Sequence, residues 1–191
     1  MNHSIYDHLL TAINWLDENK IDLLARHWLM VHSWNSRINL TAITSDEHAA
    51  WYHYRDSLEA IQLLPNGSVV DIGSGAGFPG IPLAIAEPER EVVLVEPRRK
   101  RASFLNTVKA RLGLANVSVL QTRSESQPDA LFAAAVTRAT FSCEADLVAC
   151  LDWVEADGVL IAFRGDVESP NATIHRYELM GEPRTLAVWR K

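Results

Sequence analysis

Two kinds of hydrophobic pattern divide the chain near residue 65. Before that point apolar residues recur at helical spacing, which predicts helices. The first two helices are marked by Ile5, Leu9, Ala12, Ile13 and Leu16, and by Leu24, His27, Trp28, Val31 and Trp34. A third helix is expected from Glu47 to Leu64, because Pro65-Asn66-Gly67 then predicts a turn.

Beyond the turn, short apolar runs alternate with helical segments. Strands are expected at residues 68–72, 91–96, 117–120, 131–137, 159–163 and 185–189, and helices at 81–86, 98–112 and 143–154. Gly113 is expected to stop the second of these helices. This alternation is typical of an α/β fold with a doubly wound, mostly parallel sheet and helices on both faces. We expect one domain, in which residues 1–64 form a helical N-terminal extension and residues 65–191 form the core.

Composition fits such a domain. Of the 191 residues 48% are apolar and 22% are charged, a balance typical of globular proteins. The pattern predicts no membrane span and no signal peptide. Cys143 and Cys150 would lie two turns apart on one helix, about 10 Å, which favours reduced thiols in a cytoplasmic protein. Nothing in the sequence demands a dimer, so a monomer is expected.

The formal net charge of −6 argues against tight non-specific binding of nucleic acid over the whole surface. The densest basic cluster is Arg98-Arg99-Lys100-Arg101. Taken alone, this cluster favours a solvated helix start rather than a binding site.

A glycine-rich loop follows the first predicted strand. Gly75 to Gly80 fits the G-x-G-x-x-G pattern of nucleotide-binding loops, although a tight turn would also need glycine. Asp71 places negative charge where a pyrophosphate would sit, and Pro79 removes an amide donor. Both features suit S-adenosylmethionine, a cation without phosphate. We therefore expect Asp71, Gly73 and Gly75 near this cofactor.

Polar residues end the next three predicted strands. Glu96 can accept hydrogen bonds from two ribose hydroxyls, a role that would serve NAD equally well. Ser124 and Glu125 stand where an adenine would lie, although an ordinary surface loop is an equal interpretation. Arg138 is expected to face the cleft, where it could bind a cofactor carboxylate, an RNA phosphate or a guanine edge.

The order of short motifs resembles a known family. These motifs are Trp34-Asn35 with Ile38-Asn-Leu-Thr41, His53 with Asp56-Ser57-Leu58, Asp71-Ile-Gly-Ser-Gly-Ala-Gly-Phe-Pro-Gly-Ile-Pro82, Lys100-Arg101 with Phe104-Leu105, Ser124-Glu125, Arg138-Ala139, Ala162-Phe-Arg-Gly165 and Gly181-Glu182. Together they are similar to the bacterial 16S ribosomal RNA guanine-N7 methyltransferases, also called glucose-inhibited division protein B. The resemblance covers most of the chain.

This resemblance implies a class I, Rossmann-like S-adenosylmethionine-dependent methyltransferase. Its implied substrate is N7 of one guanine in the 16S rRNA of the small ribosomal subunit. Carried over residue by residue, the cofactor contacts fall on Gly73, Phe78, Ser124, Glu125 and Arg138, and Glu96 takes the ribose role by position. Arg164 stands where the family usually has lysine, which keeps the charge but changes the shape of the group.

Methylation at guanine N7 needs no general base, because N7 carries a lone pair and no proton. We therefore expect no catalytic residue, and interpret His53 as a packed helical histidine. Alignment and exclusion of water would be the required work. The expected RNA contacts are Arg37, Arg55, Arg123, Arg138, Arg164 and Asn39, the last of which could instead be a helix cap.

Three other functions remain open at this level. The first is an S-adenosylmethionine-dependent methyltransferase that acts on a small molecule or protein, which the acidic net charge favours mildly. The second is a nucleoside-binding or RNA-chaperone module without turnover. The third is a dinucleotide oxidoreductase, against which Asp71 and Pro79 argue. No metal site is expected.

Overall fold

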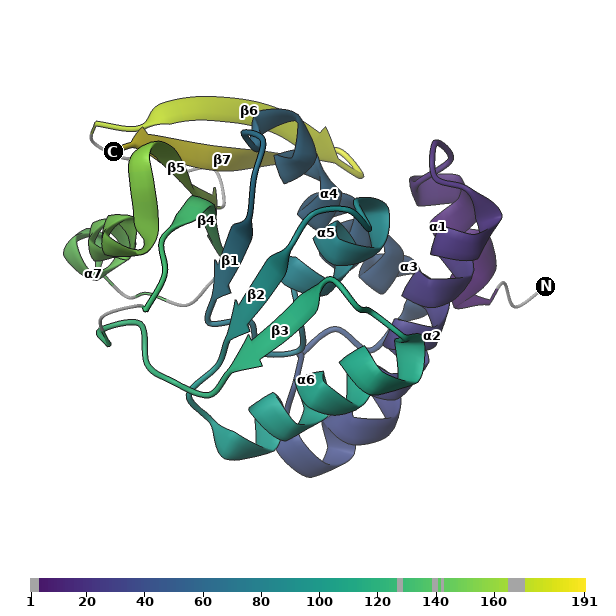
Figure 1. Cartoon of the computed structure of the whole chain (residues 1–191). Helices are drawn as coiled ribbons and strands as arrows, with labels where there is room; N and C mark the ends of the chain where they lie inside the picture. Colours follow the sequence, from purple (N-terminus) through teal and green to yellow (C-terminus); the bar gives the residue numbers. More distant parts are fainter. Residues whose placement is uncertain (1–3, 127–128, 139–140, 142, 165–170) are drawn as a thin grey trace.

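A twisted β-sheet runs through the middle of the molecule (Figure 1). The computed structural model describes residues 4–126, 129–138, 141, 143–164 and 171–191, and within them seven strands pair in the order β3-β2-β1-β4-β5-β7-β6. The strands are β1 (Val69–Ile72), β2 (Val92–Val95), β3 (Val117–Leu120), β4 (Phe132–Arg138), β5 (Val154–Arg164), β6 (Thr173–Leu179) and β7 (Glu182–Arg190). The first five are parallel, and β7 is antiparallel to its neighbours β5 and β6. The predicted α/β, mostly parallel sheet is confirmed.

The strand order reverses at β1, the topological switch point. Val69 of β1 is in register with Val92 of β2 on one side and with Ala134 of β4 on the other. The chain therefore leaves β1 toward one edge of the sheet and later returns to extend the other edge. Ligands of doubly wound sheets bind beyond the carboxyl ends of the strands at this point.

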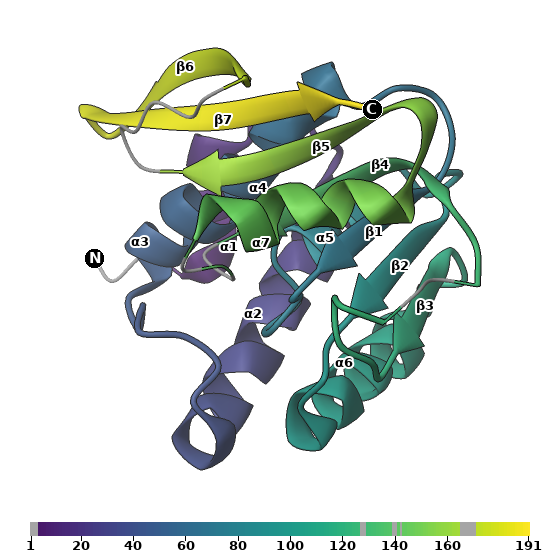
Figure 2. The same ribbon diagram turned by 90° about the vertical axis from the view of Figure 1, so that its left-hand side faces the viewer.

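Alternate side chains of the strands serve two different cores. In β2, Val92 and Leu94 pack with the helices α1 (Ile5–Ala12), α2 (Glu18–Ile38), α5 (Gly80–Ala86) and α6 (Arg99–Leu112). Val93 and Val95 point to the opposite face, which α7 (Glu144–Val148) and the 3₁₀ helix η3 (Ala149–Trp153) cover. Figure 2 shows α7 on its own side of the sheet, away from α2 and α6. Helices on both faces are thus confirmed.

The third N-terminal helix differs from its prediction. The expected α-helix from Glu47 to Leu64 is a succession of α3 (Asp46–Ala49), a π-helix η1 (Ala50–Arg55), α4 (Asp56–Leu58) and a 3₁₀ helix η2 (Glu59–Leu63). A π turn shifts the side-chain phase, and such turns are frequent at functional sites. In this segment Tyr54 is fully buried, while the side chain of its neighbour His53 lines a cavity.

Three further details concern the second half of the chain. The helix expected at 143–154 ends as the 3₁₀ helix η3, and Val154 already belongs to β5. Strand β6 was not predicted. Gly113 ends α6 in the left-handed conformation, with φ of 69°, as expected. Ala139 and Gly165, parts of two motifs above, lie outside the described residues.

Two expectations from the chain as a whole can also be compared with the structure. Cys143 and Cys150 are free thiols, the first exposed and the second buried. Within the described ranges, no helix is both long and apolar enough to cross a membrane.

Candidate cofactor and RNA site

The glycine loop between β1 and α5 is built over a buried acid. Asp71 is fully buried, and its Oδ2 accepts a hydrogen bond from the backbone N–H of Gly80 at 3.0 Å. A Cβ on Gly80 would lie 2.3 Å from Cδ2 of Leu94 and 2.7 Å from this Oδ2, so only glycine allows the approach. Burial raises the pKa of Asp71 to about 7, although the hydrogen bonds from Gly80 and Ser74 oppose the shift. Asp71 thus lies beneath the loop.

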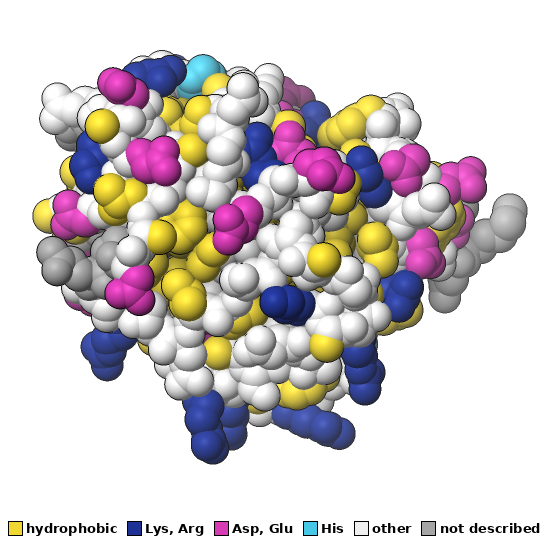
Figure 3. All heavy atoms as spheres, viewed as in Figure 1, with side chains coloured by type: hydrophobic (Ala, Val, Ile, Leu, Met, Phe, Trp, Pro, Cys, Tyr) yellow, Lys and Arg dark blue, Asp and Glu magenta, His cyan; other side chains and the backbone are white. Residues whose placement is uncertain are grey.

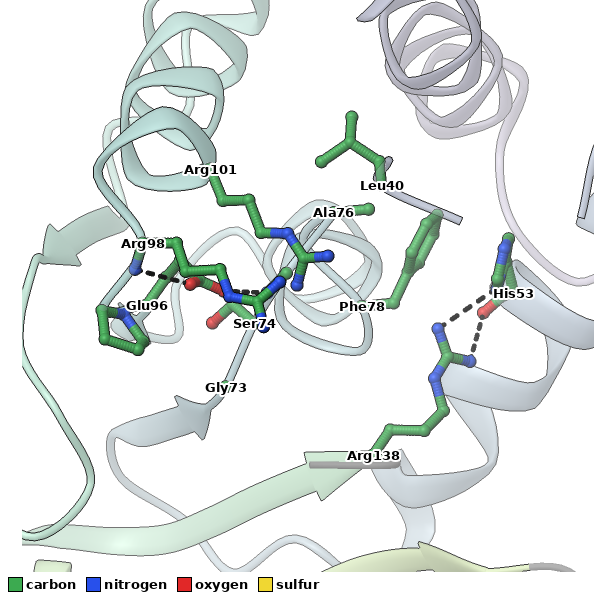
Figure 4. Close-up of a pocket in the computed structure, with 12 residues that line it drawn as sticks. Leu40, His53, Gly73, Ser74, Ala76, Phe78, Glu96, Arg98, Arg101 and Arg138 are labelled. Carbon is green, nitrogen blue, oxygen red and sulfur yellow. Dashed lines mark hydrogen bonds between the residues drawn. The ribbon is translucent and has the colours of Figure 1, made fainter. Parts of the chain in front are cut away.

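Glu96 anchors the same loop by accepting a hydrogen bond from its backbone. It follows β2, is 3% exposed, and its Oε2 accepts a hydrogen bond from the N–H of Gly75 at 3.0 Å. Its Oε1 accepts another from the N–H of Arg98 at 2.8 Å. Two backbone donors therefore fix the carboxylate at the edge of a cavity (Figure 4). Each oxygen retains a lone pair with which it can accept a hydrogen bond from a ligand hydroxyl.

Two adjoining cavities open at the carboxyl ends of β1 to β4. The first has a volume of about 410 Å³ and is bounded by the glycine loop, Glu96 and Arg138. The second, about 440 Å³, lies toward β3 beside Ser124 and Glu125. Gly73, Pro97 and Arg98 border both cavities. Their volumes lie in the usual range of small-molecule sites, and their arrangement suits an elongated nucleoside ligand.

A buried ion-pair cluster supports Arg138 at the wall of the first cavity. Its Nη1 donates to Oδ2 of Asp56 at 3.1 Å and to the carbonyl of Tyr52 at 3.0 Å. Asp56 is fully buried and also accepts hydrogen bonds from the Tyr177 hydroxyl at 2.6 Å and from Nη2 of Arg184 at 3.5 Å. The N-terminal helices, β4 and the β6–β7 hairpin therefore meet at one carboxylate.

His53 lies beside Arg138 and Phe78 (Figure 4). Its ring stacks on Phe78 with a centroid distance of 4.4 Å, and its Nδ1 accepts a hydrogen bond from Nη2 of Arg138 at 3.3 Å. Its Nε2 is 2.7 Å from Oγ1 of Thr41. Burial, and then the nearby Arg138 charge, hold the pKa of His53 well below its usual value. A neutral, fully engaged imidazole fits the packing role that the sequence predicted for it.

A second histidine, which the sequence analysis treated only as part of a hydrophobic pattern, also supports the loop. His27 of α2 is fully buried, and its Nε2 is 3.0 Å from the carbonyl oxygen of Ala76. Its Nδ1 is 3.0 Å from the Tyr54 hydroxyl. The carbonyl can only accept, so Nε2 carries the proton and Nδ1 accepts from the tyrosine. Burial lowers the pKa of His27 to about 4, and the ring therefore stays neutral. The signal in the sequence that could have indicated this role was a histidine among the apolar residues of one helix face.

The structure brings most of the predicted cofactor residues together. The first cavity is lined by Gly73, Gly75, Phe78, Glu96 and Arg138, and the second by Gly73, Ser124, Glu125 and the predicted RNA residue Arg123. Asp71 lines neither cavity. The sequence missed Leu40, Arg101, Phe141 and Asp146, which complete the walls. The cluster at Arg98 forms the solvated helix start that the sequence predicted, and Arg98 and Arg101 also border the first cavity.

The other predicted RNA residues lie outside both cavities. Asn39 ends α2 in the left-handed conformation, with φ of 48°, and its carbonyl accepts a hydrogen bond from Arg101 at 2.8 Å. Asn39 therefore caps the preceding helix rather than the following segment. Arg55 pairs with Glu59, and its guanidinium lies over the ring of Trp15.

Arg164 and Arg37 occupy separate places. Arg164 ends β5, where it is in register with Thr185 of β7. Arg37 is exposed in a groove beside α6. Among the described residues, no group of three or more His, Cys, Asp and Glu side chains is arranged to hold a metal ion.

Comparison with known proteins gives one family. The family model GidB, rRNA small subunit methyltransferase G, matches residues 20–182. A ribosomal RNA small subunit methyltransferase G from Clostridium tetani is 36% identical over 172 residues, covering 84% of this chain and 72% of that protein. The protein of the same name from Chromobacterium violaceum is 39% identical over 153 residues, covering 78% and 73%.

Solved structures with low sequence identity share the fold. A precorrin-6y C5,15-methyltransferase from Geobacter metallireducens has a TM-score of 0.55 at 11% identity, covering 79% of this chain and 90% of that one. A 16S rRNA N2 G1207 methyltransferase from Thermus thermophilus, solved with AdoMet and guanosine, has a TM-score of 0.54 at 17% identity, covering 73% and 43%. Both are similar to this chain in the arrangement of the sheet and its helices.

Proposed function

Because the chain belongs to the rRNA small subunit methyltransferase G family, we propose that it transfers a methyl group from S-adenosylmethionine to N7 of a guanine in 16S ribosomal RNA. One observation favours this donor over a dinucleotide. The first amide of α5, Gly80 N–H, donates to the buried Asp71. A pyrophosphate needs such an amide free and finds no favourable charge beside a carboxyl group.

The residues around the two cavities fit S-adenosylmethionine. Glu96, anchored by two backbone donors, would accept hydrogen bonds from the ribose hydroxyls. Ser124 and Glu125 would border the adenine in the second cavity, and Gly73 stands between the two parts. Phe78 and Arg138 would close the methionine side. When bound, the cofactor supplies an electrophilic methyl group.

The protein groups near the reacting atoms have no proton to remove, because guanine N7 attacks through a lone pair. His53 is unsuited to base catalysis, since it is buried, neutral and already bonded through both ring nitrogens. The work of the site is therefore to align the guanine with the methyl donor and to keep water out. Phe78 and His53, which stack on each other and line the first cavity, would help to exclude water.

The RNA would approach from the side where Arg98 and Arg101 border the first cavity. Arg123, on the rim of the second cavity, would contact a phosphate. We infer that Arg37, Arg55, Arg164 and Asn39 act farther from the methyl group, because they lie outside both cavities. We also propose a single-domain monomer, with residues 1–64 as the extension, that works in the cytoplasm, where ribosomal RNA is found.

A substrate comparison tests this function. The purified protein is incubated with methyl-labelled S-adenosylmethionine and, in parallel, with small ribosomal subunits, deproteinised 16S rRNA, large subunits and a protein extract. We expect label only in 16S rRNA. Binding of S-adenosylmethionine without transfer to any RNA, or transfer to protein or small molecules, would refute the proposed acceptor. Binding of NAD in its place would refute the donor.

A further inference from the structure

The two longest segments of this acidic chain without Asp or Glu are residues 23–45 and residues 97–124. The first covers most of α2 and the loop after it, and the second covers α6 and β3. The excess of Asp and Glu that gives the net charge of −6 therefore lies in the rest of the chain. Both segments carry net positive charge, although they are far apart in the sequence.

The fold places these two segments side by side. The ring of Trp34 on α2 lies 5.5 Å from that of Phe104 on α6. Nη2 of Arg101 at the start of α6 donates to the carbonyl of Asn39 at the end of α2 at 2.8 Å. At the other end, Arg26 donates to the carbonyl of Arg111 at 3.2 Å. The two helices thus pack antiparallel, and the end of α2 meets the start of α6.

A groove of about 440 Å³ lies at this meeting point. We call it the α2–α6 groove, and it is lined by Trp34, Arg37, Ile38, Arg99, Lys100 and Ser103. Its cations Arg37, Arg99 and Lys100 are exposed, and no carboxylate in the part of the chain that the structure describes forms a salt bridge with them. Figure 3 shows dark blue side chains projecting from the lower edge, where Figure 1 has α6 and the end of α2.

The position of the cations at the start of α6 is unfavourable for the free protein. Arg99, Lys100 and Arg101 occupy the first turn of α6, which contains no acidic residue. Cations at a helix N-terminus oppose the helix dipole, and no side chain caps this end. A polyanionic ligand would offset this electrostatic cost when it binds.

The groove and the first cavity both lie at the start of α6. Arg98 and Arg101 border the cavity, while the intervening Arg99 and Lys100 line the groove. Trp34 adds an aromatic surface between the cations. A positive groove with an aromatic surface is the usual arrangement for single-stranded nucleic acid, whose phosphates follow the cations and whose bases or sugars contact the ring.

We propose that the α2–α6 groove binds the sugar–phosphate backbone of the RNA strand next to the target guanine. Arg37, Arg99 and Lys100 contact phosphates, and Trp34 contacts a base or ribose. This inference rests on the proposed function, because it describes how the RNA substrate would reach the same site.

Matched double variants test the groove. Arg37→Ala with Arg99→Ala removes two groove cations, and Lys109→Ala with Arg111→Ala removes the same charge from the other end of α6. The dissociation constant for unmethylated 16S rRNA, transcribed in vitro, is measured at several salt concentrations. We expect the groove variant to bind about tenfold more weakly at 0.15 M salt, with a salt slope shallower by about 1.4, or ~0.7 for each phosphate contact.

The control variant is expected to keep nearly the wild-type affinity and slope. Both variants should bind S-adenosylmethionine like the wild type. The groove variant should melt near the wild-type temperature, because losing the unfavourable cation at the start of α6 offsets losing the favourable one at the end of α2. Equal losses in the two variants, or no loss in the groove variant, would overturn the inference.

Methyl transfer by the wild type, measured in the same preparations, separates this inference from the proposed function. If the wild type methylates the RNA but the groove variant binds it normally, only the groove is refuted. If the wild type methylates neither this RNA nor the 16S rRNA of small ribosomal subunits, the function is refuted, and the comparison of the two variants still decides whether the groove binds RNA.

Discussion

Replacement of Asp56 by alanine should destabilise the protein strongly, although Asp56 lines neither cavity. The residue is fully buried and accepts hydrogen bonds from Arg138, Tyr177 and Arg184. The side chains of the two arginines are only 13% and 25% exposed. Without Asp56 both cations would remain largely desolvated and would lose the carboxylate that they share.

The size of the effect follows from that burial. Removing one partner of a buried ion pair costs about 3–5 kcal/mol, because the remaining charge is left uncompensated. Arg138 keeps its hydrogen bond to the carbonyl of Tyr52, which favours the lower end of the range. For a chain of this length, 1 kcal/mol lowers Tm by roughly 2–4 °C. The expected decrease in Tm for Asp56→Ala is therefore about 6–12 °C.

Thermal unfolding followed by circular dichroism measures this decrease, with Asp22→Ala as the control. Asp22 pairs with Arg26 at 3.7 Å, but both side chains are at least half exposed. The same substitution at an exposed pair should leave Tm nearly unchanged. A Tm for Asp56→Ala within 2 °C of the wild type would refute the reasoning that this carboxylate joins the three parts of the fold.

Three further predictions concern the glycine loop and its supports. The contribution of His27 to the free energy of unfolding should fall by about 3 kcal/mol as the pH decreases from 6.5 to 4, because His27, with a folded pKa of about 4, takes up its proton only in the unfolded chain. Denaturant titrations of the wild type and of His27→Gln should differ in their pH dependence by that amount, and equal pH dependences would contradict it. Glu96→Gln should weaken S-adenosylmethionine binding at least tenfold, as measured by isothermal titration. The glutamine side chain has no charge, and its NH₂ group would face one of the two backbone N–H donors. Wild-type affinity of this variant would exclude Glu96 as the ribose ligand. Gly80→Ala should abolish cofactor binding, because the added Cβ would overlap Leu94. Gly113→Ala should retain cofactor binding, because nothing lies within 4 Å of the added Cβ there. Equal affinities of the two variants would contradict the need for glycine where the loop approaches Leu94.

The parts of the fold that local sequence could predict are those with local causes. The run before Asp71 is apolar on both faces of a strand, and the glycines after it require a turn, so β1 and its loop were evident. Strand β6 was missed because it is the last strand of the sheet and six of its seven residues are exposed or half-buried. Its pattern lacks the apolar run that a central strand needs.

The candidate site was predictable where a residue stands at the end of a strand. Glu96 and Arg138 follow β2 and end β4, and strand ends of a parallel sheet share one edge. The cluster at Asp56 could not be predicted in this way, because Tyr177 and Arg184 come from the distant hairpin. Nor could the groove cations, since their meaning depends on how α2 packs against α6.

The measurement that tests the central claim most directly is the identity of the modified nucleoside. Small ribosomal subunits from cells that lack this methyltransferase are incubated with the protein and methyl-labelled S-adenosylmethionine, and the 16S rRNA is digested to nucleosides. The account predicts that the label elutes as 7-methylguanosine, and that Glu96→Gln reduces its amount at limiting cofactor. Label in any other nucleoside, or none in the RNA while the cofactor binds, would contradict it.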